Sequence, residues 1–270
     1  MASQYSLADY DSDEERAKYP QVPEDNLASA ALFCVNMLES KNINYALFGG
    51  FAIRLLGGKR DTRNVDILFQ GNIKDIWSIV ETQHRLVIPS SRLTTDILKV
   101  LVHTGPGYDS CDVQVPVAVT LIESGINQPS ISWHPSHPWF QHTDEQLTEG
   151  VTTGYRGSPK SLATNRLLSS VDTIAGHRPI YVLGVFDIIN VKLAAFMHDR
   201  LDKDKEDLLF LMRKYPEKVC TRIKDLDQEA ATIFMDSIPD DVRPELTEEI
   251  FNFKIHGVTP MSHREYFGSP

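Results

Sequence analysis

Residues 45–69 read YALFGGFAIRLLGGKRDTRNVDILF, and this stretch decides the fold that the sequence predicts. It contains a short apolar strand, the glycine pair Gly49 and Gly50, a short helix, a basic turn and a second strand. A glycine pair that opens a helix presents backbone N–H groups to an anion. On the second strand Asn64 and Asp66 stand two positions apart, so both side chains lie on one face, where a divalent cation can bind.

The surrounding sequence extends this stretch into a mixed sheet with helices. Amphipathic spacing predicts a helix before the glycine pair and another over residues 72–83. Two further strands are expected at 98–103 and 111–119, joined by a glycine-rich hairpin loop. In the second of these strands Asp112 alternates with apolar residues. It therefore projects beside Asp66 if the two strands are neighbours, and is a candidate third acidic position.

The sequence predicts the α+β fold class and four parts. Residues 1–22 are polar and acidic, which is typical of a disordered arm. Residues 23–125 form the α/β core. Residues 126–178 lack periodicity and predict a long loop or lid, in which Trp139 offers a large apolar surface that can close over a ligand. Residues 179–270 are punctuated by prolines and predict a mainly helical C-terminal domain.

Composition and charge exclude several classes of function. A formal net charge of −10 over 270 residues argues against general attraction to a nucleic-acid polymer or an anionic membrane. The three cysteines are odd in number and far apart, as expected for reduced thiols in a reducing compartment. No secretory signal and no apolar run of transmembrane length is visible. We therefore expect a cytoplasmic protein whose partner is a small molecule.

A second patch supports the interpretation of residues 45–69. Residues 192–195 read KLAA, and residues 200–208 read RLDKDKEDL. Together the two patches resemble the nucleotidyltransferase superfamily, particularly its stand-alone fungal-type members and the small bacterial antibiotic- and toxin-type enzymes. The resemblance implies a nucleotidyltransferase-like mixed β-sheet followed by a mainly helical part, with the ligand in the cleft between them. In such enzymes the glycine pair holds the triphosphate of an NTP, and carboxylates bind two Mg²⁺ ions that align a hydroxyl with the α-phosphorus.

Several positions acquire an expected role in this way. Asp66 and Asp112 are the expected catalytic acids, and Asp66, Asp112 and Asn64 are the metal ligands if the reaction depends on metal. The substrate-binding residues expected from the motif, the basic turn, the lid and the second patch are Gly49, Gly50, Arg54, Arg63, Asn64, Trp139 and Lys192.

Asn64 stands where the resemblance predicts a carboxylate. An amide oxygen can coordinate Mg²⁺ but lacks the negative charge, so the site keeps two acidic residues where three are expected. The sequence therefore favours a protein of this fold whose cleft binds and transforms a small, largely apolar metabolite of secondary metabolism by orientation, as a cyclase or isomerase does, without a cofactor. The alternative is Mg²⁺-dependent transfer of a nucleotidyl group from an NTP to a small hydroxylated molecule. The second alternative is a non-catalytic binder of a small molecule or nucleotide.

The same residues also have structural interpretations, which the sequence leaves open. A glycine pair also serves a tight turn between strand and helix. Any alternating strand offers polar positions such as Asp66 and Asp112 on its solvent face. Lys192 also suits a half-buried helix face, with its ammonium group reaching water.

Overall fold

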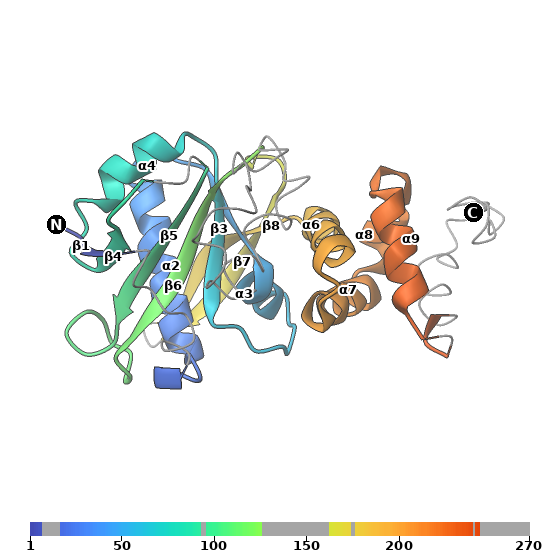
Figure 1. Cartoon of the computed structure of the whole chain (residues 1–270), viewed down its shortest axis with the longest axis horizontal. Helices are drawn as coiled ribbons and strands as arrows, with labels where there is room; N and C mark the ends of the chain where they lie inside the picture. The colour runs from blue at the N-terminus through green and yellow to red at the C-terminus, as the bar shows by residue number, and fades with distance from the viewer. Residues whose placement is uncertain (7–16, 93–95, 126–161, 174–175, 240, 244–270) are drawn as a thin grey trace. The chain divides into compact units, whose positions relative to one another are not determined.

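The computed structural model of the protein describes six stretches of the chain, namely residues 1–6, 17–92, 96–125, 162–173, 176–239 and 241–243 (Figure 1). These residues fall into two compact units, the first ending at Gly184 and the second beginning at Val185. Within the described residues, no helix is both long enough and apolar enough to cross a membrane.

The first unit is built on a sheet that, in the described part of the chain, has eight strands in the order β1-β4-β5-β6-β3-β2-β8-β7. The strands are β1 (Ser3–Tyr5), β2 (Tyr45–Phe48), β3 (Asn64–Phe69), β4 (Leu86–Pro89), β5 (Ile97–Thr104), β6 (Val115–Glu123), β7 (Arg166–Thr173) and β8 (Gly176–Leu183). The pairs β1–β4, β2–β8 and β3–β6 are parallel, and the other pairs are antiparallel. This mixed sheet with helices confirms the predicted α+β class.

Among the described residues of the first unit, the helices α2 (Glu24–Glu39), α3 (Gly49–Leu55) and α4 (Ile73–Val80) accompany the sheet. The longest of them, α2, packs against β3, β5, β6 and β7 (Figure 1). Its apolar side chains recur at helical spacing, so that Leu27, Ala31, Cys34 and Leu38 are fully buried. Acidic residues in its first turn complement the helix dipole. The other side of this core is supplied by alternate, fully buried residues of two strands: Val65 and Ile67 of β3, and Val117, Val119 and Leu121 of β6.

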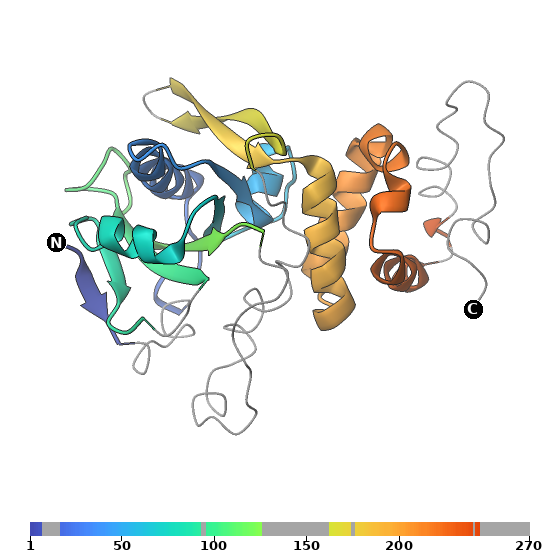
Figure 2. The same ribbon diagram turned by 90° about the horizontal axis from the view of Figure 1, so that it is seen from above.

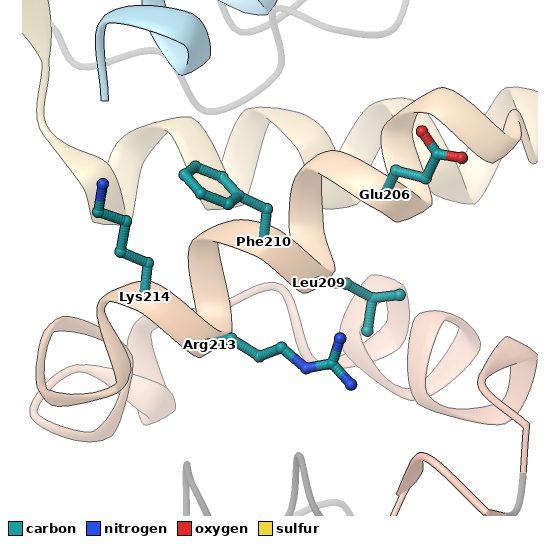
Figure 3. Close-up of a pocket in the computed structure, with 5 residues that line it drawn as sticks. All are labelled: Glu206, Leu209, Phe210, Arg213 and Lys214. Carbon is teal, nitrogen blue, oxygen red and sulfur yellow. The ribbon is translucent and has the colours of Figure 1, made fainter. Parts of the chain in front are cut away.

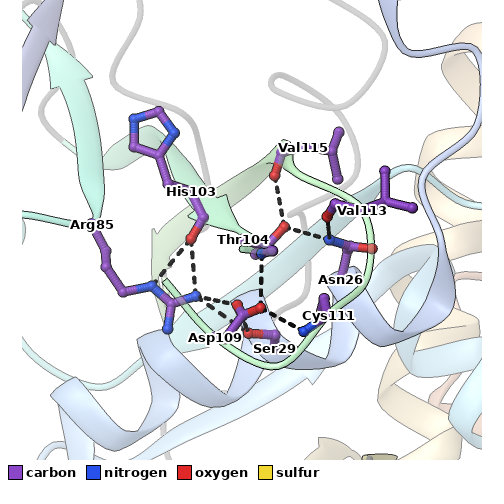
Figure 4. A network of polar contacts seen from close by, with 10 residues as sticks. Asn26, Ser29, Arg85, His103, Thr104, Asp109, Cys111, Val113 and Val115 are labelled. Carbon is purple, nitrogen blue, oxygen red and sulfur yellow. Dashed lines mark hydrogen bonds and ion pairs between the residues drawn. The ribbon is translucent and has the colours of Figure 1, made fainter. Parts of the chain in front are cut away.

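A partly buried polar network fixes the loop between β5 and β6 to α2 (Figure 4). Asp109 accepts hydrogen bonds from the amides of Gly105 and Cys111, at 2.7 and 2.9 Å. It also accepts one from the Ser29 hydroxyl, at 2.5 Å, and it pairs with the Arg85 guanidinium at 2.7 Å. One carboxylate therefore joins the loop, the helix and the residue that precedes β4.

A second set of buried contacts lies beside the first. Asn26, at the start of α2, is 1% exposed and donates to the Thr104 hydroxyl and to the Val113 carbonyl, both at 2.7 Å (Figure 4). Thr104 in turn donates to the carbonyl of Val115 at 2.6 Å. Because these side chains satisfy backbone groups of the loop, the residues before Val115 need no partner strand.

This network explains one difference from the sequence-based prediction. A strand was expected over residues 111–119, whereas β6 begins at Val115. The amide of Cys111 and the carbonyl of Val113, which a strand partner would otherwise bind, are taken by Asp109 and Asn26. Competition from side chains thus delays the start of the strand.

Two other strands lie where the sequence predicts an arm and a loop. Residues 3–5 precede the acidic residues of the expected arm, which begin only at Asp9, and they pair with β4 as β1. The Tyr5 hydroxyl also donates to the Lys99 carbonyl at 3.2 Å. At the opposite edge, β7 and β8 form the hairpin drawn in yellow in Figure 2. In β7, the consecutive residues Leu167 and Leu168 are both exposed, at 41% and 67%. The strand therefore lacks the alternation of apolar and polar residues from which a strand is predicted.

The described part of the second unit consists of helices: α6 (Val185–Asp199), α7 (Asp202–Lys214), α8 (Pro216–Cys220), a 3₁₀ turn at Ile223–Asp225, and α9 (Gln228–Ser237). In this unit α6 packs against α7, α8 and α9. Phe196 and Phe234 meet edge to face, with ring centroids 5.7 Å apart, and both are buried.

The second sequence patch forms an ion cluster inside this unit. The Lys192 ammonium lies 2.5 Å from Asp204 Oδ1 and 2.8 Å from Asp207 Oδ2, and each of the three residues is at most 9% exposed. Lys192 comes from α6 and the carboxylates from successive turns of α7, so the cluster joins two helices. Burial alone lowers the pKa of Lys192, but the two carboxylates outweigh burial and raise the pKa, so the lysine is charged.

Asp109→Asn is expected to lower the free energy of unfolding by about 2 to 3 kcal/mol, because Arg85 loses its counter-charge and an amide cannot accept every bond. Burial alone raises the pKa of Asp109, but hydrogen bonds from Ser29, Cys111 and Gly105 outweigh it and lower the pKa. The stabilisation is therefore complete above the usual carboxyl pKa of about 3.9 and is lost as the pH falls through the lowered pKa. Urea unfolding at neutral and at acidic pH measures both effects.

Asp112→Asn is the matched control for this experiment, because Asp112 lies on the same loop and is exposed. It should leave stability unchanged. An equal loss of stability in both variants would contradict the role assigned to Asp109.

Lys192→Met is expected to lower the free energy of unfolding by about 3 kcal/mol, because two buried carboxylates lose their counter-charge. Lys218→Met makes the same chemical change at an exposed position of α8 and should have little effect. Urea unfolding of the full chain compares the two. If Lys192→Met is as stable as Lys218→Met, the ion cluster does not stabilise the unit.

Candidate functional site

The glycine pair forms a close contact with Asp66. Gly49 begins α3 directly after β2 and has a φ of +69°, a conformation that favours glycine. Phe48, the last residue of β2, is the register partner of Asp66 on β3. A Cβ atom on Gly49 would overlap the Asp66 carboxylate. Position 49 therefore needs glycine for two independent reasons, and the carboxylate lies against the turn from strand to helix.

Gly50 leaves room for two further polar groups. A Cβ atom at this position would lie 2.6 Å from the Thr62 hydroxyl oxygen and 2.8 Å from a terminal nitrogen of Arg60. Both distances are shorter than real Cβ contacts, so the hydroxyl and the guanidinium group lie where a side chain would stand. The Arg60 guanidinium also donates to the Asp61 carbonyl at 3.0 Å. The glycine pair thus borders a carboxylate at one residue and a cation at the next.

Strand register shows which residues share a face with Asp66. In the parallel pair β3–β6, Asn64 is opposite Ala118 and Asp66 is opposite Thr120. In the antiparallel pair β5–β6, Thr120 is opposite Lys99. Paired residues on adjacent strands point to the same side of a sheet. We call this side the site face, and it carries Asn64, Asp66, Ala118, Thr120, Lys99 and Leu101.

The site face is more open than the face that packs on α2. Asn64 is exposed, and Asp66, Ala118 and Lys99 are half-buried. The alternate residues of the same strands, Val65, Val117 and Val119 among them, are fully buried. Thr120 and Leu101, on the same face, are buried, so the polar side chains that are at least partly accessible on it are those of Asn64, Asp66 and Lys99.

Asp112 does not join this face. It lies in the loop before β6, and the register puts Thr120 rather than Asp112 opposite Asp66. Asp112 precedes Ala118, the partner of Asn64, by six positions. The expected place of Asp112 beside Asp66 is therefore corrected. The cause is the shorter β6, whose first residues are held in the loop by Asp109 and Asn26.

The carboxylate set does not fit two Mg²⁺ ions. On the site face, β6 contributes Ala118 and Thr120, and β2 contributes Phe48 opposite Asp66. Neither strand that flanks β3 supplies an acid there, and position 64 is an amide. Across the described residues, no group of three or more His, Cys, Asp or Glu side chains is placed to hold a metal ion. Asp66 is therefore the one carboxylate that these three strands bring to this face.

The two predicted arginines are bound to other parts of the first unit. Arg54 forms ion pairs with Glu24, at the start of α2, and with Asp61, at 3.4 Å for the latter. Arg63 donates to the Tyr19 carbonyl. These contacts tie α3 and the basic turn to the chain before and within α2. Substrate binding by Arg54 and Arg63 stays a prediction.

The remaining predicted residues lie elsewhere. Lys192 belongs to the second unit, where Asp204 and Asp207 bind its ammonium group. Its contact with a phosphate stays a prediction. Trp139, with the rest of the expected lid up to residue 161, lies outside the described residues.

Sequence reasoning missed Thr120 and Lys99 on the site face. The signal was available for Thr120, because the apolar series Val117, Val119 and Leu121 places the residue between the last two on the opposite side. Lys99 was a lone charge between the apolar residues Leu98 and Val100. Its relation to Asp66 depends on pairing between three strands, which no local pattern encodes.

Two surface hollows lie apart from the site face. One has a volume of about 480 Å³ and is lined by Leu209, Phe210 and three charged residues of α7, which Figure 3 shows along one helix surface. The Lys214 ammonium stands 5.5 Å from the centre of the Phe210 ring. The other, of about 780 Å³, lies between α2 and α4. Neither contains a residue of the site face.

No family model matches the chain, and no curated protein matches it in sequence. Solved structures do match. An antigenic nucleotidyltransferase-like protein from Paracoccidioides brasiliensis is 15% identical over 85% of this chain and 94% of its own, with a TM-score of 0.49. A candidate nucleotidyltransferase from H. pylori is 13% identical over 87% of this chain and 86% of its own, with a TM-score of 0.42.

A third match is the lincosamide antibiotic adenylyltransferase LnuA with lincomycin bound. It is 14% identical over 71% of this chain and 97% of its own, with a TM-score of 0.34. At such identities and TM-scores, no residue role and no activity is carried from those proteins to this chain.

Gly49→Ala is expected to destabilise the protein by about 1 to 3 kcal/mol more than Gly107→Ala, because only the first methyl group meets a packed side chain. Gly107 has a φ of +94° and nothing within 4 Å of an added Cβ, so it isolates the backbone strain. Urea unfolding gives the difference. Equal losses in the two variants would mean that Asp66 does not pack against Gly49.

Proposed function

We propose that this protein has a nucleotidyltransferase-type fold whose site face binds and transforms a small organic molecule without divalent metal ions. The observation that carries the proposal is the register of β3 with β6. It places Ala118 and Thr120 opposite Asn64 and Asp66, so a single carboxylate stands where two-metal transfer needs several.

The charge on this face explains why metal chemistry is disfavoured. Two divalent cations held a few ångströms apart repel each other, and acidic side chains must offset that repulsion. Asp66 offers one negative charge, and Asn64 and Thr120 offer neutral oxygens. Neutral oxygens can complete the coordination shell of a cation, but they do not offset the positive charge of two divalent cations.

The groups that remain suit chemistry by orientation. Asp66 is half-buried and can exchange a proton with a bound molecule, as a general acid or base does. Thr120 can donate or accept a hydrogen bond beside it. Ala118, which is half-buried on the same face, provides apolar surface for the body of a ligand. Cyclisation or isomerisation needs a fixed reactive conformer, exclusion of water and a group of this kind, and no cofactor.

Nucleotidyl transfer is the second candidate, and one observation favours it. The glycine pair keeps the close approach to Asp66 and leaves room at Gly50 for the Arg60 guanidinium and the Thr62 hydroxyl. Such a corner suits a phosphate group. Since Mg²⁺ is often held by one or two carboxylates together with substrate phosphates, a single ion carried by an NTP is compatible with Asp66.

The double variant Asn64→Asp/Thr120→Asp should gain metal binding, because it restores carboxylates on two adjacent strands beside Asp66. We expect the wild-type protein to bind Mn²⁺ with a dissociation constant weaker than about 1 mM, and the double variant to bind at least tenfold more tightly. Calorimetric titration with Mn²⁺, with and without ATP, measures this. Asn36→Asp makes the same change at an exposed position of α2 and should have no effect.

A different result would reverse the ranking of the two candidates. If the wild-type protein binds Mn²⁺ with ATP below millimolar concentration and releases pyrophosphate in the presence of a hydroxylated acceptor, the metal-free proposal is wrong. Nucleotidyl transfer is then the function.

A further inference from the structure

We infer that β7 pairs with the β7 strand of a second copy of this chain, so that two sheets join into one across a two-fold axis at Ser169. The inference concerns an interaction surface at the edge of the sheet, and it does not depend on the proposed function. Three features carry it: the strand order, the hydrogen-bond pattern of the β7–β8 ladder and the exposure of two leucines.

Within the described part of the chain, β7 is the last strand of the sheet and pairs with β8 on one side only (Figure 2). Its eight residues, Arg166–Thr173, pair with β8 without a break in register, and they include no lysine and no proline. Natural edge strands are commonly protected from further pairing by lysine, by proline, by a bulge or by being very short. β7 has none of these four features, so it can accept another strand.

The backbone groups that face outward from β7 belong to its even-numbered residues. The Gly184 amide donates to the Asn165 carbonyl at 2.9 Å, which makes these two residues a hydrogen-bonded pair of the ladder. Bonded and non-bonded pairs alternate along an antiparallel ladder, so the odd-numbered residues of β7 bond to β8. Pro179, which has no N–H group, is opposite Ser170, as a non-bonded pair allows. The N–H and C=O groups of residues 166, 168, 170 and 172 therefore point away from β8.

β7 also exposes apolar side chains on both of its faces. Leu167 and Leu168 are 41% and 67% exposed, and the other large apolar side chains exposed among the described residues are those of Met1 and Val113. Consecutive residues of a strand point to opposite faces of the sheet. A strand added at this edge therefore covers one leucine on each face.

The sequence of β7 is complementary to itself in the antiparallel direction. Residues whose backbone groups face outward must be opposite residues of the same kind, and a two-fold axis at Ser169 meets this condition. The pairs of opposite residues are then Ser169–Ser169, Arg166–Asp172, Leu167–Val171 and Leu168–Ser170. Opposite charges face each other at both ends of the paired segment, and apolar residues meet between them.

The charge of this edge suits a second copy. β7 carries one cation, Arg166, and one anion, Asp172, although the whole chain has a net charge of −10. In the paired register no like charges are opposite each other. Arg166 also donates to the Tyr45 carbonyl at 3.2 Å and can keep that bond, because the pairing needs complementary charges rather than a close ion pair. A strand of a different protein must happen to match this pattern, whereas a second copy always does.

Sedimentation velocity of the full chain over a range of concentrations tests the inference. A single strand pair buries less than the roughly 1,200 Å² at which stable interfaces begin, so we expect a reversible dimer with a dissociation constant of about 1 to 100 µM. Leu168→Lys should weaken the dimer at least about tenfold, because it removes apolar cover and brings two lysines close to the axis. Val113→Lys makes a comparable change at an exposed position of the loop before β6 and should associate as the wild type does.

Cysteine cross-linking tests the position of the axis. Ser169 is opposite its own counterpart in a non-bonded pair, where the two Cβ atoms are about 4.5 Å apart, close enough for a disulfide. Ser169→Cys should therefore form a disulfide-linked dimer with oxidised glutathione. Ser170→Cys is the matched control, because residue 170 is opposite Leu168 of the second copy and lies too far from its own counterpart. The wild type gives the background from its own cysteines, which are buried or half-buried.

The inference is overturned if the chain stays monomeric throughout the concentration range, if Leu168→Lys associates as the wild type does, or if Ser169→Cys and Ser170→Cys cross-link equally. The cross-link keeps the test decisive should Leu168→Lys fail to fold. The metal-free proposal is decided separately, by the Mn²⁺ titration.

Discussion

The parallel pairing of β3 with β6 is the constraint on which the candidate site depends. It aligns Asp66 with Thr120 and, through β5, with Lys99. A slip of one residue in the register of these strands would turn Asp66 and Thr120 into the core beside α2. It would also expose Val65 and Val119, which are fully buried. The hydrophobic core therefore fixes which residues face a ligand. The composition of the site follows from packing on the opposite side of the same strands.

The helical unit and the sheet unit handle buried charge in different ways. In the sheet unit Asp109 gathers hydrogen bonds from a loop and a helix, and its partner Arg85 is 13% exposed in its side chain. In the helical unit Lys192 is enclosed by two carboxylates of one helix. Both arrangements satisfy a charge where water has little access, and each joins segments that are distant in sequence.

The local part of the fold could be predicted from sequence, and the long-range part could not. The strand, glycine pair, helix and second strand of residues 45–69 follow from spacing and glycine chemistry, and the structure has them as β2, α3 and β3. The edge strands β1 and β7 depend on partners far along the chain. Asp112 was misplaced beside Asp66 because Asp109 and Asn26 compete for backbone groups of its segment. The alternation of residues along β6 is visible in the sequence and places Thr120 on the side opposite Val119, but only the pairing register relates Thr120 to Asp66.

The close approach of Gly49 and Asp66 bears on how such a site changes through evolution. Asp66 fills space against a turn that has no side chain, so its replacement leaves a void at the junction of strand and helix. Asn64 is exposed, and the fold places no comparable demand on it. An uncharged residue at position 64 therefore costs the fold little, whereas packing against Gly49 constrains position 66 whether or not Asp66 takes part in a reaction. An aspartate at position 66 is thus explained by the shape of the scaffold before it is explained by chemistry.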